Sequence, residues 1–166
     1  MRAEIDNSFR RIMTWEGGGR YHEVAGDAGG GTKWGVSQRQ YPELNIEGLS
    51  RDRALLIFED DYWNKVKADL LPRGIRHDVV DFAFNSGPLR AKVRLQRAAN
   101  IALGHARIAE DGQIGPMTLA AVNAANTTRM LTIYRALRVA FLVGIVERRP
   151  DQGKFLYGWL RRANSP

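Results

Sequence analysis

The sequence predicts an all-α fold with one small β-hairpin or loop region near its N-terminus. Three observations lead to this prediction: apolar residues recur at helical spacing along most of the chain, glycine and proline separate these segments, and glycines concentrate between residues 17 and 35. The 166 residues, 44% of them hydrophobic, are enough for one core or for two small subdomains that share an interface.

The first predicted helix ends at Glu16, which shares a face with the apolar residues Ile5, Phe9, Ile12 and Met13. Three glycines at 17–19 should end this helix. Residues 20–37 are expected to form a glycine-rich loop with room for one hairpin. A carboxylate at the end of an apolar stripe should point into the protein.

The second predicted helix starts after Ser50, a suitable N-cap, and its apolar stripe runs through Leu55, Phe58, Tyr62 and Val66. Further helices are expected over residues 78–86, 93–103, 118–125 and 131–145.

Two Gly-Pro pairs separate these later helices, at residues 87–88 and 115–116. Gly115 is expected to supply an unusual backbone angle, and Pro116 to start a helix. The first pair is our predicted domain boundary, which gives an N-terminal domain over residues 1–88 and a helical C-terminal domain over residues 89–166.

Charge is divided unequally between these two predicted domains. Residues 1–88 carry 12 Lys and Arg against 14 Asp and Glu, a net charge of −2, whereas residues 89–166 carry 13 against 4, a net charge of +9. A strongly cationic domain attracts a polyanion such as nucleic acid, an anionic membrane surface or a charged cell envelope.

The composition excludes several classes of protein. The chain has no cysteine, so disulfides and zinc–thiolate sites are impossible, and the histidines at 22, 77 and 105 are too scattered to predict a metal site. We therefore expect no metal and no cofactor. The first residues lack the apolar stretch of a secretory signal, and no long apolar run predicts a membrane span. A cytoplasmic location is expected until another component gives access to an external substrate.

Glu16, Asp27 and Thr32 could together cleave a glycosidic bond. Desolvation of a carboxyl favours its neutral, proton-bearing form, and a glycosidic oxygen leaves readily only when it is protonated. Asp27 lies in the polar loop, where it should stay ionised and, with the Thr32 hydroxyl, could hold a water molecule and accept its proton. Each residue also has an ordinary structural explanation, because Glu is common at helix ends and Asp is common beside glycine in turns.

The stretch from Glu16-Gly17-Gly18 through Asp27, Gly29-Gly30 and Thr32 to Gly35-Val36-Ser37 resembles glycoside hydrolase family 108. These are muramidases of phages and prophages. The resemblance implies a lysozyme-like fold, with Glu16 as the catalytic acid and Asp27 and Thr32 in the second and third roles. The path between Glu16 and Asp27 is longer than usual in the family, which leaves Glu23 as a competitor for the second carboxylate.

Two further segments carry resemblances. Residues 81–88, Asp-Phe-Ala-Phe-Asn-Ser-Gly-Pro, resemble a helix near the active-site groove of lysozyme-like proteins. This implies that Phe82 and Ala83 lie in the core, that Asn85 and Ser86 face sugar, and that Asp81 is a structural partner. Residues 95–98 and 111–119 resemble the predicted peptidoglycan-binding domain that often follows family 108 catalytic domains.

Aromatic side chains are candidates for stacking on sugar rings, and Tyr21 and Trp34 are favoured because they lie on the glycine-rich loop. Tyr62, on an apolar helical stripe, is expected in the core, and Trp63 is a weaker candidate for stacking.

The tail residues 155–160 are expected to dock onto the core, with contact to a membrane as the alternative. The cationic arginines at 135, 138, 148, 149, 161 and 162 are expected to hold the protein near an anionic envelope.

These observations predict a monomeric endolysin whose partner is bacterial peptidoglycan and which hydrolyses the β-1,4 bond between N-acetylmuramic acid and N-acetylglucosamine. Anionic envelope components or an outer membrane are further possible partners of the basic domain. The alternatives are a lytic transglycosylase, which needs no water-positioning pair, and a muramidase that assists protein release across the wall. A zinc amidase is set aside because the sequence offers no zinc ligands at suitable spacing. The non-enzyme alternative is a basic module that binds nucleic acid or the envelope.

Overall fold

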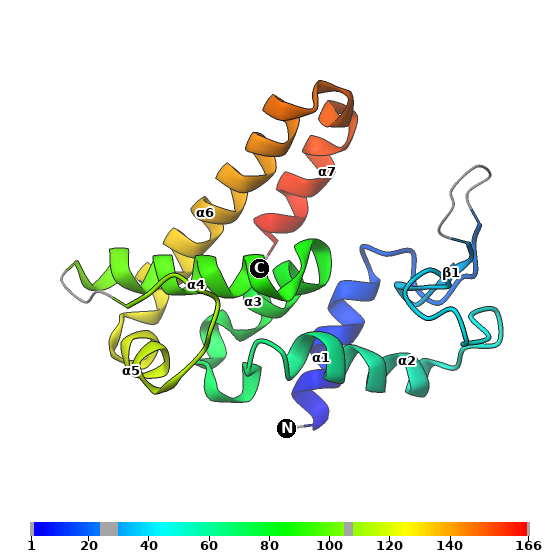
Figure 1. The fold of residues 1–166 in the computed structure, drawn as a ribbon, viewed down its shortest axis with the longest axis horizontal. Helices are drawn as coiled ribbons and strands as arrows, with labels where there is room; N and C mark the ends of the chain where they lie inside the picture. Colours follow the sequence, from blue (N-terminus) through cyan, green and yellow to red (C-terminus); the bar gives the residue numbers. More distant parts are fainter. Residues whose placement is uncertain (1, 24–29, 105–107, 166) are drawn as a thin grey trace. The chain divides into compact units, whose positions relative to one another are not determined.

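The computed structural model describes residues 2–23, 30–104 and 108–165, and this part of the chain contains seven α-helices and one two-stranded antiparallel sheet (Figure 1). The predicted all-α class with a small hairpin is thereby confirmed. The chain forms two compact units, residues 1–61 and 62–166. The division into domains at residue 88 stays a prediction. Within the described ranges no helix is long and apolar enough to cross a membrane.

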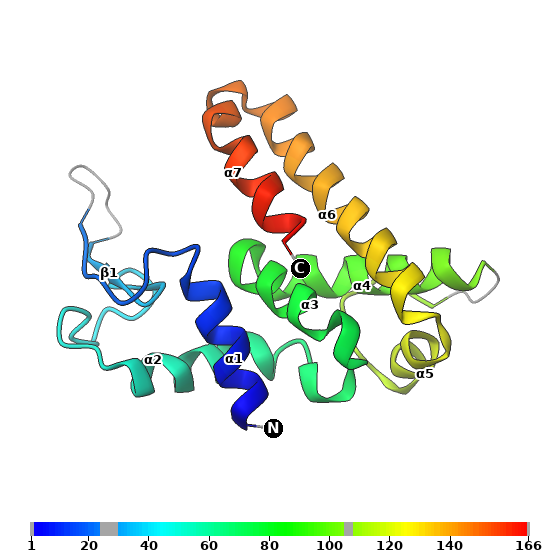
Figure 2. The same cartoon turned by 180° about the vertical axis from the view of Figure 1, so that it is seen from behind.

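The first unit is built on two helices, α1 (Arg2–Met13) and α2 (Arg51–Phe58), which pack against each other (Figure 2). Phe9 and Phe58 meet between them with ring centroids 5.3 Å apart. The predicted N-cap is confirmed, because the Ser50 hydroxyl accepts a hydrogen bond from the Arg53 backbone N–H at 3.3 Å.

Helix α1 ends at Met13, three residues before the predicted end at Glu16. The residues after Met13 form turns with shorter-range bonds, since the Trp15 N–H donates to the Ile12 carbonyl at 3.0 Å. The Thr14 hydroxyl donates to the Arg11 carbonyl at 2.6 Å. The Trp15 backbone bond spans three residues instead of four, which tightens the chain at the helix end. Glu16 therefore leaves the apolar stripe and is half-buried, which corrects the expectation that it points into the core.

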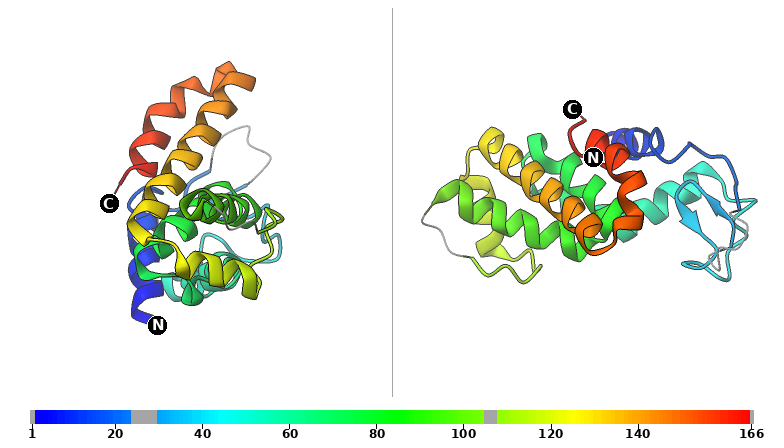
Figure 3. Two further views of the ribbon diagram at one scale, coloured as in Figure 1. Left: turned by 90° about the vertical axis from the view of Figure 1, so that its left-hand side faces the viewer. Right: turned by 90° about the horizontal axis from the view of Figure 1, so that it is seen from above.

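The expected hairpin consists of β1 (Thr32–Lys33) and β2 (Val36–Ser37), which pair antiparallel (Figure 3). Trp34 and Gly35 form its two-residue loop, with φ angles of +54° and +71°. Positive φ at both loop residues is the geometry that matches the twist of a tight hairpin.

A π-helix over Glu59–Trp63 follows α2 and corrects the predicted stripe. A π turn adds one residue to the helical repeat. The next buried position after Phe58 is consequently Trp63, which is 1% exposed, whereas Tyr62 is half-buried. The Trp63 ring packs under the Arg76 guanidinium, whose Cζ lies 5.9 Å from the ring centroid.

The second unit is a helical assembly around a long central helix. Helix α6 packs against α3, α4 and α7, and α5 packs against α4; α6 and α7 run side by side in Figures 1 and 2. Two short 3-10 turns, Ala68–Leu70 and Pro150–Gln152, complete the unit. The helices are α3 (Arg73–Ser86), α4 (Pro88–Leu103), α5 (Pro116–Ala124), α6 (Thr127–Arg148) and α7 (Gly153–Ala163).

A buried ion-pair cluster joins three helices of this unit. Asp81 on α3 accepts from Arg138 on α6 at 2.6 Å and from Arg162 on α7 at 2.8 Å, and each of the three side chains is less than a tenth exposed. Asp81 therefore has the structural role that the sequence predicts, because it pairs with arginines of two other helices. Beside the cluster, Arg135 pairs with Asp78 at 2.6 Å.

The buried stripe of α6 runs through Met130, Tyr134, Arg138 and Leu142. The sequence predicts a helix over residues 131–145, but an arginine in its buried stripe is not expected from the residue type. Arg138 is only 2% exposed because Asp81 supplies its counter-charge. Arg135, Arg138 and Arg162 are thus held in ion pairs inside the unit, which corrects the expectation that they face an anionic envelope.

The connection between α4 and α5 is organised by the buried Gln96. Its side-chain amide donates to Asp111 at 2.9 Å and accepts from the Gly112 backbone N–H at 2.7 Å. Gly112 has a φ of +75°, whereas Gly115 has an ordinary extended φ of −96°. The unusual angle expected at Gly115 therefore belongs to Gly112, and Pro116 starts α5 as predicted.

The aromatic tail forms α7 and docks through Arg162 and Ala163, which are buried. Phe155 and Tyr157 stay 46% and 75% exposed, so the expectation that these two rings dock onto the core is wrong. Phe155 instead stacks on Trp159 of the same helix, with centroids 5.9 Å apart.

Candidate active site

Glu16 lies in a turn that reverses the chain directly after α1. The Gly18 N–H donates to the Met13 carbonyl at 2.9 Å, and Gly17 and Gly18 have φ angles of +76° and +72°. Residues with a Cβ rarely adopt this conformation, so consecutive glycines permit the reversal. The half-buried Glu16 side chain therefore lies in the turn after α1 and not within the helix.

Trp34 connects the hairpin to this turn. Its indole lies so close to Gly19 that a β-carbon there would sit 2.1 Å from Trp34 Cζ2. The same ring lies 6.2 Å from Phe9 of α1, centroid to centroid. Trp34 is half-buried, so its packing role in this unit is larger than the sugar-stacking prediction implied.

Thr32 begins β1 and also forms an isolated bridge with His22. Its backbone N–H and C=O both pair with His22, at 2.9 and 3.0 Å, while Ser37 is its partner across the hairpin. Both backbone groups of Thr32 are therefore held by His22, and the Thr32 side chain is half-buried. The hydroxyl is therefore attached to a residue whose backbone is held by two hydrogen bonds.

Tyr21 and Glu23 form a polar pair at the edge of the sheet. The Tyr21 hydroxyl donates to a carboxylate oxygen of Glu23, and this hydrogen bond, together with some desolvation, raises the pKa of Tyr21. The ring of Tyr21 covers Gly31, where a β-carbon would lie 2.3 Å from the ring. Glu23, the competitor for the second carboxylate, is exposed. Asp27 lies outside the described residues.

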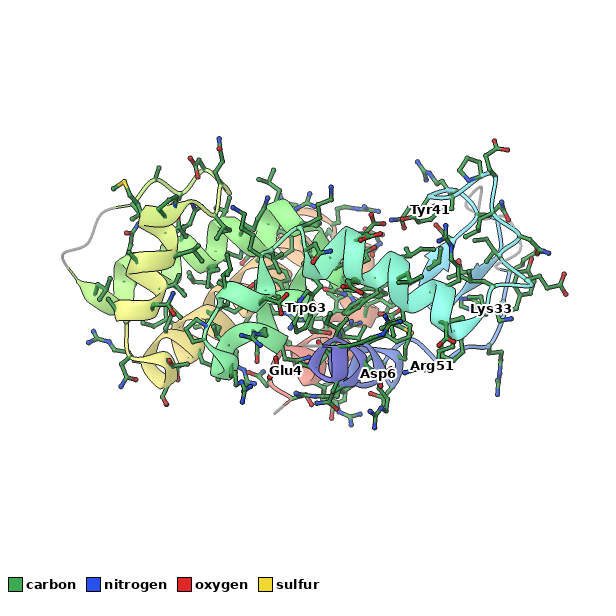
Figure 4. The ribbon with its side chains drawn as sticks, turned by 90° about the horizontal axis from the view of Figure 1, so that it is seen from below. Glu4, Asp6, Lys33, Tyr41, Arg51 and Trp63 are labelled. Carbon is green, nitrogen blue, oxygen red and sulfur yellow. The ribbon has the colours of Figure 1, made fainter. Side chains whose placement is uncertain are left out.

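Two interactions hold the hairpin and α1 to the rest of the first unit. Asp6 of α1 pairs with Arg51 of α2 at 2.5 Å, and Figure 4 shows these two side chains beside each other. The Lys33 ammonium group donates to the Glu47 carbonyl at 2.6 Å. The hydrogen bond from Arg51, then that from Arg10 and the charges of both arginines, lower the pKa of Asp6 against the opposing effect of desolvation.

Trp15, beside Glu16, is a candidate that the sequence analysis did not single out. It is 40% exposed, more than most large apolar side chains of the protein. An exposed aromatic ring beside the candidate acid is suited to stacking on a sugar face. The sequence feature that could have identified Trp15 is its position outside the apolar stripe of α1 and directly before the Glu-Gly-Gly motif.

Asn85 and Ser86 belong to the second unit, whereas Glu16, Tyr21, Thr32 and Trp34 belong to the first. The Ser86 hydroxyl donates to the Asn85 side-chain oxygen at 3.0 Å. Both residues line a hollow of about 360 Å³, together with Arg90, Phe141, Ile145, Arg148 and Arg149. Phe82 and Ala83, one turn earlier on α3, are fully buried as predicted.

The chemistry available in the first unit is that of a carboxyl, a hydroxyl and aromatic rings on a glycine-rich framework. Among the described residues no cluster of three or more His, Asp or Glu forms a candidate metal site. Acid-catalysed glycoside cleavage requires a carboxyl that can donate a proton, and Glu16 is a candidate for this group.

Comparisons with known proteins agree with this arrangement. Residues 9–87 match the family model described as Glycosyl hydrolase 108, and residues 90–164 match the model described as Predicted Peptidoglycan domain. A solved structure titled "Structure of Brucella abortus SagA" is similar, with a TM-score of 0.79 and 29% identity over 98% of this chain and 91% of that chain. No curated protein matches significantly. The N-terminal part of the chain is a member of glycosyl hydrolase family 108, followed by a member of the predicted peptidoglycan domain family.

Proposed function

We propose that this peptidoglycan hydrolase is an N-acetylmuramidase that cleaves the β-1,4 bond between N-acetylmuramic acid and N-acetylglucosamine. The observation that carries the proposal is the position of Glu16, in the turn that ends α1 and next to the Gly19–Trp34 contact with the hairpin. A half-buried carboxyl on a rigid framework is suited to donate its proton to the glycosidic oxygen.

The second half of the proposed reaction uses the loop. Asp27 accepts a proton from the attacking water, and the Thr32 hydroxyl, on a backbone held by two hydrogen bonds to His22, positions that water. Attack by water and not by a carboxylate would invert the anomeric centre. The resemblance to family 108 supports this choice of residues, with Glu23 as the competitor for the role of Asp27.

The proposed biological role is lysis of a bacterial host by a phage-type endolysin. The enzyme would stay in the cytoplasm until released and then act, as a monomer, on the cell wall. A muramidase that helps proteins cross the wall would perform the same chemistry in another setting.

The products of digestion test the reaction. Purified peptidoglycan treated with the enzyme should yield fragments with reducing muramic acid ends. Anhydro-muramic acid ends would identify a lytic transglycosylase, and new free amines with intact glycan would identify an amidase. Either outcome would overturn the proposed reaction.

A second experiment tests Glu16. Glu16→Gln keeps the size of the side chain but removes the transferable proton, so the cleavage rate should fall by about 10²–10⁴-fold while the fold persists. Glu43→Gln is the matched control, because Glu43 is exposed on the loop before α2. A Glu16→Gln enzyme that keeps a tenth of the wild-type rate would exclude Glu16 as the acid.

A further inference from the structure

A groove lined by arginines runs between α4 and α6 in the second unit. One hollow, of about 470 Å³, is lined by Val93, Arg94, Arg97, Leu137, Ala140, Phe141, Gly144 and Arg148. The hollow beside Asn85 and Ser86 shares Phe141 and Arg148 with it, so the two adjoin. Five arginines and no Asp or Glu appear among the described residues that line them.

These arginines differ from the others in the same unit. Arg135, Arg138 and Arg162 each pair with a buried carboxylate. Within the described part of the chain, Arg90, Arg94, Arg97 and Arg148 have no such ion pair, and the fifth, Arg149, faces the exposed Asp151 at 3.8 Å. Four of the five groove arginines therefore repel one another without a neutralising carboxylate among the described residues, and an anionic ligand would relieve this repulsion.

The groove is organised before any ligand binds. Arg90, Arg94 and Arg97 follow one another at spacings of four and three residues, so they share one face of α4 over about 10 Å. The Arg94 Cζ lies 4.4 Å from the centroid of Phe141, and the Arg90 Cζ lies 5.7 Å from it. Phe141 thus holds two guanidinium groups by cation–π contact.

Two further details place the charges inside the groove. A β-carbon on Gly144 would lie 3.3 Å from the Arg148 guanidinium, so Arg148 folds back over α6. Burial lowers the pKa of Arg94, and the nearby charges of Arg90 and Arg97 add to this effect against an opposing contribution from Tyr134. Arg94 is consequently only partly hydrated, which strengthens its interaction with a bound anion.

We infer that this arginine groove binds the carboxylates of the peptide stems of peptidoglycan. Guanidinium groups pair with carboxylates through two parallel hydrogen bonds. Between the guanidiniums the groove surface is aliphatic and aromatic, which suits a peptide with methyl side chains better than a continuous phosphodiester. Asn85 and Ser86, at one end, add amide and hydroxyl groups that can pair with peptide or sugar.

This inference rests on the proposed function for its choice of polymer, and it adds a second contact besides the one with the glycan. The first unit would act on the sugar chain, and the groove would retain the attached peptide stems. Peptide-bearing glycan should therefore be held more firmly than glycan from which the stems have been removed.

The test measures binding of a soluble disaccharide–tetrapeptide, which contains no bond that the proposed muramidase cleaves. In titration calorimetry, Arg97→Gln/Arg148→Gln should bind at least tenfold more weakly than the wild type, because two charge-assisted contacts are lost. Both side chains are exposed, so the fold should persist. The control, Arg129→Gln/Lys154→Gln, removes two exposed charges elsewhere in the unit and should bind within about twofold of the wild type.

Chemical variants of the probe identify the group that is bound. The same disaccharide–tetrapeptide with amidated carboxylates should bind weakly to all three proteins. Equal binding of the amidated probe, or wild-type affinity of Arg97→Gln/Arg148→Gln, would overturn the inference. Tighter, equally arginine-dependent binding of inorganic polyphosphate would assign the groove to a phosphate polymer and overturn it as well.

Hydrolysis is measured separately on insoluble peptidoglycan with the wild-type enzyme. If no reducing ends appear while the tetrapeptide probe binds through the groove, the proposed function fails and the groove assignment stands. If reducing ends appear but the groove variant binds normally, only the groove assignment fails.

Discussion

The indole of Trp34 lies against the backbone of Gly19, in the space that a side chain at Gly19 would occupy. Gly19 follows Glu16 by three residues, and Trp34 follows Thr32 by two. This single contact therefore joins the turn that carries the proposed acid to the hairpin that carries the proposed water-binding hydroxyl. We therefore expect the geometry of the candidate site to depend on it.

Replacement of Gly19 by Ala tests this dependence. The new β-carbon would lie 2.1 Å from Trp34 Cζ2, so the indole or the turn must move. Displacement by about 1 Å in a catalytic arrangement can cost about 10² in rate, and we expect a loss of this order in glycan cleavage. The cleavage rate and the midpoint of urea unfolding should be measured together.

Gly158→Ala is the matched control, because a β-carbon at this position in α7 meets no atom within 4 Å. It should leave cleavage unchanged. If Gly19→Ala behaved like Gly158→Ala, Trp34 would not position the site.

The identity of the second carboxylate is tested by three loop variants. Asp27→Asn should lower kcat strongly with little change in substrate binding, and Thr32→Ala should lower it less, because Thr32 carries no charge. Glu23→Gln should be tolerated, since Glu23 is exposed and accepts a bond from Tyr21. Steady-state kinetics on soluble glycan fragments measure these effects. A damaging Glu23→Gln combined with a tolerated Asp27→Asn would transfer the role to Glu23.

Much of the fold follows from local patterns that the sequence displays directly. The Ser50 N-cap, the Pro116 helix start and the end of α3 at Ser86 each depend on the preferences of one or two residues. The family motif around Glu16 predicted which segment would carry the candidate site, and the hairpin after it forms as expected.

The errors have physical causes that local patterns do not contain. The π turn at Glu59–Trp63 shifted burial from Tyr62 to Trp63, and a helical repeat of 3.6 residues cannot anticipate an extra residue. Arg138 was assigned to the surface by its type, yet Asp81, distant in sequence, neutralises it in the core. Both outcomes depend on tertiary packing.

Asp81 should dominate the stability of the second unit. In Asp81→Asn, Arg138 and Arg162 would remain buried without a counter-charge, which typically costs about 3–5 kcal/mol in the free energy of unfolding. Urea unfolding at pH 7 measures this loss. Asp151→Asn is the control, because its pair with Arg149 is about two-thirds exposed and should change stability little. If both variants lost the same free energy of unfolding, the buried ion pairs would contribute no more to stability than the exposed pair.

The same cluster predicts a dependence on pH. Burial alone would raise the pKa of Asp81, but the charges of Arg138 and Arg162 outweigh it and hold the pKa below its ordinary value. A depressed folded-state pKa contributes stability above the unfolded-state value, and this contribution is lost as pH falls through the folded-state value. The gap in unfolding free energy between the wild type and Asp81→Asn should therefore narrow from pH 7 to pH 3. A difference in unfolding free energy that stayed constant with pH would contradict the lowered pKa of Asp81.

Gly112 and Gly115 offer a final test, because the same substitution should have opposite effects at two positions three residues apart. Gly112 has a φ of +75°, where an alanine costs about 1–2 kcal/mol. Gly115, with a φ of −96° and no atom within 4 Å of its would-be β-carbon, should accept alanine with a gain of about 0.4–1 kcal/mol through the unfolded state. Urea unfolding of each variant shows whether the free energy of unfolding falls or rises. A β-carbon at Gly112 would also lie 2.5 Å from the Leu89 side chain, so Gly112→Ala should be compared in a Leu89→Ala background, which removes that contact. If Gly112→Ala then became neutral, the clash and not the backbone angle would explain the glycine.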